Sequence, residues 1–415
     1  MAIIRPFKAL RSAKEKSHLV SSVPYDVVNR EEAKELAGEN QLSFLRVTRS
    51  EIDLDENTSP YSPEVYKKAK ENLDNLKKEA PLVEDEKPHF YLYRLEMNGK
   101  SQVGIGATFS VDDYDNNVIM KHEKTRKEKE DDRTNHIVTT GAQTGVVFLT
   151  YRDVEAVNKI VDQTMKNTEP IYDFTSVDGI KHSVWILPDN YNNTIVEEIG
   201  KVKNLYIADG HHRAASAGRA REEKKKANPK HTGNEEYNYF IAVLFPAAQL
   251  NILPYNRVVA DLNGKSTDEF LNEVSEKFTV EKTDKKEPSE KRTYGMYLNK
   301  KWYSLKPKDN VTASLSLSKS VGETLDVSVL QDFLLTPVLD IDDPRTNKRI
   351  DFVGGIRGTK ELEKLVDSGK AAAAFSLYPV SLDDLMNISD AGEIMPPKST
   401  WFEPKLRDGL LCHLI

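Results

Sequence analysis

The chain has 415 residues and a formal net charge of −7, from 59 Lys and Arg against 66 Asp and Glu. This length predicts two or three domains with a substantial core, and the 38% hydrophobic and 30% charged composition excludes collagen-like and wholly disordered chains. Proteins that neutralise a nucleic acid backbone usually carry a basic surplus, so the acidic balance argues against nucleic acid as a partner.

The first clear elements are a helix and a hairpin. Apolar residues recur at helical spacing over residues 63–79, which predicts a surface helix with one apolar stripe. The β-rich runs 89–97 and 101–111 flank Asn98-Gly99, a dipeptide that tolerates positive φ. The sequence therefore predicts a β-hairpin in this region.

From about residue 145 the pattern changes to short apolar runs that alternate with helices. A helix near 193–202 leads into the apolar run 205–208, then into DGHHR at 209–213 and an Ala-rich helical stretch. Shorter elements follow residue 250, among them a hairpin around Leu298-Asn299 and a helix near 327–335. This order predicts an α/β to α+β fold.

Three regions are expected from these patterns. Residues 1–117 form an N-terminal α+β region that contains the hairpin, residues 118–250 form a core that contains the DGHHR turn, and residues 251–415 form a second α+β region. No repeat and no long Gly, Ser or Pro-rich linker separates them, so we expect the regions to pack closely.

The DGHHR turn is the most informative stretch, because it follows an apolar strand and opens a helix, where unpaired N–H groups and the helix dipole favour an anion. Asp209 is expected to cap this helix, Gly210 to allow a close approach, and Arg213 to offer a planar fork for phosphate oxygens. His211 and His212 can donate or accept protons. The alternative is a capped helix with an arginine salt bridge.

A second group is His122-Glu123, which follows the apolar residues 118–120. Glu123 is a candidate general base, with His122 beside it. The charge run after it, residues 126–133, is interpreted as a solvated helix face.

The tail at 395–410 forms a third group, with Lys398, Thr400 and Lys405 between and beside prolines that stiffen the loop. These residues are candidates for phosphate contacts. The alternative is a tail that folds over the core through Trp401 and Phe402.

Several familiar signals are missing from the sequence. It contains no P-loop and no Rossmann fingerprint, and the adjacent histidines lack the spacing of a helical metal site, so no metal-ligating residues are assigned. Cys412 is the only cysteine, which excludes an internal disulfide framework and favours a reducing compartment. With no apolar run long enough for a signal or a membrane span, we expect a cytoplasmic protein.

Several motifs together resemble the bacterial family known as domain of unknown function 1015, over nearly the whole chain. These motifs are RPFKALR at 5–11, VPYDVV at 23–28, FLRVTR at 44–49, KHEKT at 121–125, YIADGHHRAASA at 206–217, LPYNRVV at 253–259 and MPPKSTWFEPKL at 395–406.

A more distant resemblance covers residues 118–245, where an HE pair precedes the strand, DGHHR and helix. This region is similar to the ParB and sulfiredoxin-like superfamily, in particular its free-serine kinases, which phosphorylate L-serine with ADP or ATP. The resemblance implies that Glu123 is the base and that residues 209–213 hold the nucleotide phosphates. The 86 residues between Glu123 and Asp209 and the region after 245 depart from those compact kinases.

Together, the residues and the resemblance lead us to expect a nucleotide-dependent phosphotransferase that acts on a small hydroxyl substrate such as serine, with Mg²⁺ as a companion. The alternative is a nucleotide-binding switch or regulatory protein of ParB type that transfers no phosphoryl group.

Overall fold

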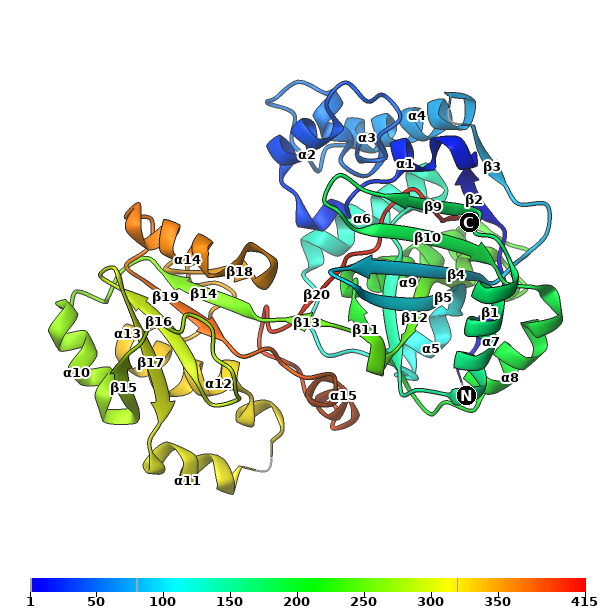
Figure 1. The fold of residues 1–415 in the computed structure, drawn as a ribbon. Coiled ribbons are helices and arrows are strands. Elements are labelled where there is room, and N and C mark those ends of the chain that lie inside the picture. Colours follow the sequence, from blue (N-terminus) through cyan, green and yellow to red (C-terminus); the bar gives the residue numbers. More distant parts are fainter. Residues whose placement is uncertain (1, 80, 319) are drawn as a thin grey trace. The chain divides into compact units, whose positions relative to one another are not determined.

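The computed structural model describes the chain except Met1, Ala80 and Lys319 and divides it into two compact units (Figure 1). Unit 1 comprises Met1–Leu250 and Pro404–Ile415, and unit 2 comprises Asn251–Glu403. The predicted regions 1–117 and 118–250 therefore lie in one unit, whereas the predicted region 251–415 is divided after Glu403. The reason is strand pairing between segments that are distant in sequence.

The centre of unit 1 is a mixed sheet of nine strands, counted over the described residues. In spatial order the strands are β6 (Ile119–Met120), β11 (Leu205–Asp209), β8 (Val147–Tyr151), β12 (Tyr239–Pro246), β5 (Lys100–Ser110), β4 (Tyr91–Met97), β10 (Lys181–Ile186) and β9 (Tyr172–Thr175), with β1 (Ile4–Arg5) paired to β5. β4 and β5 come from the first predicted region, and they pair with β10 and β12 from the second. A single sheet thus joins both regions.

The predicted hairpin is confirmed by β4 and β5, which pair antiparallel. Asn98 and Gly99 connect the strands with φ angles of 52° and 74°. Both angles are positive, as the tight turns that match strand twist require.

Helices cover this sheet, and their apolar faces build the main core. They include α5 (Val111–Asp115), α7 (Glu155–Asn167), α8 (Asn192–Gly200) and α9 (His211–Ala227). Val157 and Ile160 of α7, together with Ala214 and Ala217 of α9, are buried in one cluster with the strands. The small side chains of α9 allow its first turns to lie close to β8 and β12, which places DGHHR at the end of β11.

A second sheet of unit 1 brings the two ends of the chain together. It consists of β3 (Leu82–Glu84), β2 (Ala9–Ser12), β21 (Cys412–Leu414) and β7 (Ala142–Gln143), and the nearby helices are α1 (Ser17–Val20), α2 (Arg30–Ala37), α3 (Leu45–Thr48), α4 (Pro63–Glu79) and α6 (Lys127–Thr140). The predicted helix at 63–79 is confirmed by α4, whose Leu73 and Leu76 are buried with Phe44.

Unit 2 is built on an antiparallel sheet of six strands within its described residues. In spatial order they are β15 (Phe278–Lys282), β17 (Lys301–Pro307), β16 (Tyr294–Leu298), β19 (Ala373–Leu377), β14 (Tyr255–Val259) and β18 (Ile350–Gly354), while β13 (Ile252–Leu253) pairs with β20 (Trp401–Phe402). The predicted hairpin around Leu298-Asn299 is confirmed by β16 and β17.

The helices of unit 2 are α10 (Thr267–Lys277), α11 (Asp309–Leu317), α12 (Asp326–Leu330), a π-helix (Gln331–Leu335), α13 (Thr336–Leu339), α14 (Gly358–Asp367) and α15 (Leu382–Asp390). The helix predicted near 327–335 is α12 continued by the π-helix. The predicted α/β to α+β class is confirmed by both units. Among the described residues, no helix combines the length and apolarity needed to cross a membrane.

Candidate functional site

The candidate site begins where β11 ends and α9 starts. Gly210 occupies the N-cap position with φ of 95°, and no side chain caps the helix. The prediction that Asp209 caps α9 is wrong: β11 continues through Asp209, and the Asp209 carboxylate instead accepts a hydrogen bond from Lys405 Nζ at 3.2 Å. Gly210 has no side chain and therefore offers no acceptor to the first N–H groups of this 17-residue helix.

The Gly210→Ala variant is expected to lower the free energy of unfolding by about 1–2 kcal/mol, because a Cβ disfavours positive φ. Gly218→Ala is the matched control. Gly218 lies inside α9, where an added Cβ would meet only Val111 Cγ1 at 3.6 Å, so alanine there is expected to add about 0.5–1 kcal/mol. Urea unfolding of both variants measures this difference, and equal stability of Gly210→Ala and the parent would contradict it.

The two histidines of the turn are fixed as neutral side chains. His211 Nε2 accepts the backbone N–H of His122 at 3.4 Å, and His212 Nε2 accepts that of Arg126 at 3.0 Å. A ring nitrogen that accepts a hydrogen bond carries no proton, so the proton of each ring is assigned to Nδ1. Burial lowers the pKa of His211 to about 3 and also lowers the pKa of His212, in agreement with neutral rings.

Glu123 lies next to this turn. Its Oε2 atom is 3.6 Å from His211 Nδ1, the nitrogen assigned the proton, and 39% of its side chain is exposed. His122 is buried, and its ring packs edge-on against that of His211, with the two ring centroids 4.4 Å apart. Burial lowers the pKa of His122, and the nearby His211 adds to this effect. Of this group, Glu123 is the member that a substrate in solvent can reach.

Arg213 is buried and held by the protein. One terminal nitrogen donates to both carboxylate oxygens of Asp26, at 2.7 and 2.6 Å, and the other donates to the Val146 carbonyl at 2.7 Å. Only 5% of its side chain is exposed. The arginine salt bridge considered as an alternative at the sequence level is thus present, and both terminal nitrogens have protein partners.

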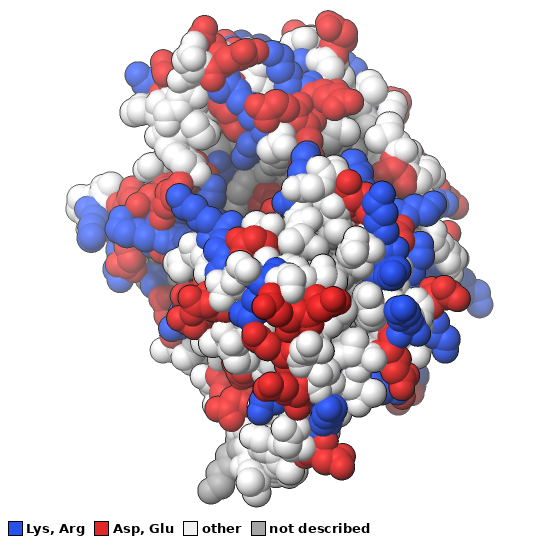
Figure 2. Space-filling view, turned by 90° about the vertical axis from the view of Figure 1, so that its left-hand side faces the viewer, with Lys and Arg blue, Asp and Glu red and all other residues white. Residues whose placement is uncertain are grey.

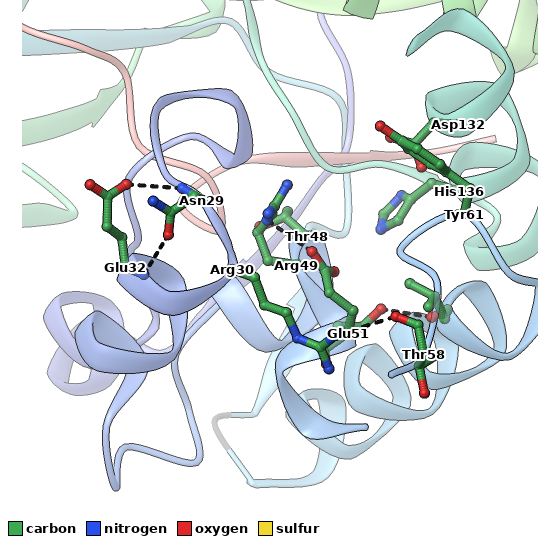
Figure 3. A network of polar contacts seen from close by, with 12 residues as sticks. Asn29, Arg30, Glu32, Thr48, Arg49, Glu51, Thr58, Tyr61, Asp132 and His136 are labelled. Carbon is green, nitrogen blue, oxygen red and sulfur yellow. Dashed lines mark hydrogen bonds and ion pairs between the residues drawn. The ribbon is translucent and has the colours of Figure 1, made fainter. Parts of the chain in front are cut away.

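Asp26 is carried by a rigid segment. It lies in a 3₁₀ turn (Tyr25–Val27) just before α2, which begins with a capping box: Asn29 Oδ1 accepts from the Glu32 N–H at 2.8 Å, and Glu32 Oε2 accepts from the Asn29 N–H at 2.9 Å (Figure 3). Arg30 anchors the start of α2 by donating to the Glu51 carbonyl at 2.6 Å. These contacts fix Asp26 opposite Arg213.

The returning tail of unit 1 supplies two further charged groups. Burial opposes ionisation of Asp209, but the cations Lys405 and Arg213 outweigh it and lower the pKa of Asp209. Asp408 is 1% exposed, and its Oδ2 has no hydrogen-bond partner among the described residues. Burial raises the pKa of Asp408 to about 7, with Arg213 opposing the rise and Asp26 adding to it.

The other tail candidates belong to unit 2. Lys398 Nζ lies 5.5 Å from the centre of the Tyr255 ring, and Ser399 Oγ donates to the Pro396 carbonyl at 2.6 Å. Thr400 lies in the same unit. The site in unit 1 therefore gathers Glu123, the DGHHR turn and Lys405. Within the described chain, no three His, Cys, Asp or Glu side chains form a group that could hold a metal ion.

Sequence reasoning missed three residues that surround Arg213. Tyr25 and Asp26 belong to the VPYDVV motif, and Asp408 follows the last tail motif by two residues. Arg213 lies 5.6 Å from the centre of the Tyr25 ring. The motif indicated that residues 23–28 matter to the family, but no local sequence pattern linked Asp26 to Arg213, 187 residues later in the chain.

The fold and site describe a mixed α/β protein with a titratable cluster where one strand turns into a helix. Residues 4–328 match the family described as "Protein of unknown function (DUF1015)", and the chain belongs to this family. No curated protein matches the chain.

Three solved structures are among those that match the chain. A conserved hypothetical protein from Pyrococcus furiosus is 12% identical, with a TM-score of 0.36, over 73% of this chain and 93% of that chain. A free serine kinase in complex with AMP is 10% identical, with a TM-score of 0.36, over 72% and 86%. C-terminally truncated SbnI from Staphylococcus aureus is 12% identical, with a TM-score of 0.38, over 74% and 86%. These scores lie below 0.5, so the neighbours carry no argument about the activity of this chain.

Proposed function

We propose that the chain is a nucleotide-dependent phosphotransferase whose acceptor is the hydroxyl of a small molecule, with free L-serine as the acceptor and ADP or ATP as the donor. The observation that carries this proposal is the position of Glu123. Its accessible carboxylate lies 3.6 Å from neutral His211, in the first turn of α9, whose N-cap residue is a glycine. A base and an anion-binding helix start thus adjoin each other.

The first turn of α9 has the donors that a nucleotide phosphate requires. Its N-cap residue, Gly210, has no side chain to accept from the first backbone N–H groups, and the Nδ1–H assigned to His212 is a further donor. Lys405 contributes positive charge beside Asp209. Arg213 acts in this proposal as a positioning residue, because its terminal nitrogens already bind Asp26 and Val146. Gly210, with φ of 95°, permits the sharp turn that aims these donors.

In the proposed reaction, Glu123 takes the proton of the acceptor hydroxyl as the hydroxyl oxygen forms a bond to the terminal phosphorus. The bond from that phosphorus to the bridging oxygen breaks, and the shortened nucleotide leaves with the bridging oxygen. His211 lies beside Glu123, with Nδ1 3.6 Å from Glu123 Oε2, and burial keeps this imidazole neutral. Mg²⁺ would be held mainly by phosphate oxygens and water, and its charge would offset that of the phosphates.

Charge and composition support a small-molecule partner. Acidic and basic side chains are interspersed over the face shown in Figure 2, and the net charge of the chain is −7, in contrast to the basic stripe that follows a nucleic acid backbone. The single cysteine, Cys412, is buried and unpaired. We place the activity in the cytoplasm on this basis.

The test has two steps on the full chain. Nucleotide binding is expected to raise the melting temperature in a panel of ADP, ATP and CTP with Mg²⁺, because a ligand of the folded state stabilises it by mass action. The protein is then incubated with the nucleotide that binds and with L-serine, and phosphoserine is measured by mass spectrometry. Failure to phosphorylate any amino acid or hydroxy acid would overturn the assignment as a kinase.

The second candidate is a nucleotide-responsive switch without phosphotransfer, and the Asp209–Lys405 ion pair favours it. Lys405 follows the point where the chain returns from unit 2 to unit 1. A phosphate bound at the turn would compete with Asp209 for this lysine and so act on the connecting segment. A rise in melting temperature with nucleotide, without any phosphorylated product, is the result that favours this function.

A further inference from the structure

Unit 2 contains a cavity of about 540 Å³ that is separate from the site in unit 1. Pockets of 300–1,000 Å³ are typical of small-molecule sites. The lining comes from β14, from the segment around α12 and the π-helix, and from the loop before β20. This lining includes the polar and charged side chains of Arg257, Ser320, Glu323, Asp332 and Glu393.

Arg257 is a buried cation in the wall of this cavity. It is 3% exposed and donates to the carbonyl oxygens of Tyr255, of Lys398 at 2.9 Å and of Pro397 at 3.2 Å. No carboxylate of the described residues forms an ion pair with it, in contrast to Arg213, which has Asp26. Burial lowers the pKa of Arg257 to about 9. The carbonyls occupy both terminal nitrogens of Arg257 but carry no net charge, so an anionic group in the cavity would supply the missing counter-charge.

The same cavity is lined by carboxylates. Glu323 and Asp332 are exposed to solvent, and partial desolvation together with the charge of Glu323 raises the pKa of Asp332. Glu393 Oε2 accepts from the Gly322 N–H at 2.8 Å and from Ser320 Oγ at 2.7 Å, and Glu323 Oε2 accepts from Ser318 Oγ. Glu323 and Asp332 therefore repel each other at a place where a cation would be stabilised.

We propose that this cavity binds a small zwitterion of the amino acid or short peptide class, with its carboxylate at Arg257 and its ammonium at Glu323 and Asp332. A ligand with only negative charge would be repelled by the two acids. A ligand with only positive charge would leave Arg257 without a counter-ion. A molecule that carries both charges matches the cation and the two acids of this lining, and the volume of the cavity admits a dipeptide.

Three matched probes separate the charges: L-alanyl-L-alanine, its N-acetyl derivative, which lacks the ammonium, and its C-terminal amide, which lacks the carboxylate. Isothermal titration calorimetry on the full chain is expected to show that the free dipeptide binds about tenfold tighter than either blocked form. The twenty free amino acids form the second arm and distinguish an amino acid site from a peptide site.

The Asp332→Asn variant is expected to lower the affinity for the dipeptide toward that of the N-acetyl form, because Glu323 alone then faces the ammonium. Asp309→Asn, an exposed position in α11, is the matched control. Arg257→Gln is expected to weaken the dipeptide and the N-acetyl form but not the amide. Arg257 is buried, so the Arg257→Gln variant can fail to fold. If it does, the affinities of Asp332→Asn for the three peptides test the proposal. Equal affinity for the three peptides, or no binding by any probe up to about 10 mM, would overturn the proposal.

Discussion

The Glu123→Gln variant is expected to lower the rate of phosphoserine formation by about 10²–10⁴ while leaving nucleotide affinity nearly unchanged. Glutamine keeps the shape of the side chain and still offers an oxygen to His211 Nδ1–H, which lies 3.6 Å from the carboxylate. It loses the basic oxygen that accepts the hydroxyl proton. The rate is measured with L-serine, Mg²⁺ and saturating nucleotide, and affinity is measured by calorimetry.

Glu128→Gln is the matched control, because Glu128 is exposed in the first turn of α6, five residues after Glu123. This control variant is expected to leave the rate unchanged. If Glu123→Gln is as active as the parent, Glu123 is not the base. If both variants lose nucleotide binding, the change acts on the fold of this region instead of on proton transfer. The melting temperature of each variant separates this last case from a loss of chemistry.

Asp408 is expected to make the protein less stable as the pH rises from about 4 to 7. Its pKa is 3.8 in the unfolded chain and about 7 in the folded chain, so between these values the folded state binds more protons. The free energy of unfolding therefore falls with pH through this group, by on the order of 4 kcal/mol in total, and stays level above pH 7. The full contribution is present below pH 4.

The Asp408→Asn variant is expected to remove this slope, because an amide does not titrate in this range. Urea unfolding at pH 4, 5, 6 and 7 measures it. Burying the amide changes the free energy of unfolding equally at all four pH values, so its dependence on pH can still be measured. Asp162→Asn, an exposed position in α7, is expected to keep the slope of the parent. A variant of Asp408 that retains the full slope would show that another group carries the pH dependence.

The elements predicted correctly from the sequence are those fixed by neighbouring residues. The hairpin of β4 and β5 follows from Asn98-Gly99 between two β-rich runs, and α4 follows from apolar residues three and four positions apart. The strand, turn and helix around Gly210 follow from the same kind of pattern. In each case the period of the apolar residues is a property of one short segment.

The contacts that define the site are not local. Asp26 and Arg213 are 187 residues apart, and Asp209 and Lys405 are 196 apart. No periodicity or turn chemistry connects such pairs, because the large sheet brings them together only after it has formed. The wrong assignment of Asp209 as a cap has the same cause: its carboxylate is bound by a lysine near the other end of the chain.

The return of the chain to unit 1 has a consequence for synthesis on the ribosome. β21 pairs with both β2 and β7, so the second sheet of unit 1 is completed only by residues made after all of unit 2. Until then β2 and β7 each have an unpaired edge, and exposed edges promote association between nascent chains. Residues 144–411 separate β7 from β21, so at about 5–20 residues per second this interval lasts roughly 13 to 54 seconds, which makes β2 and β7 the strands that a chaperone would shield.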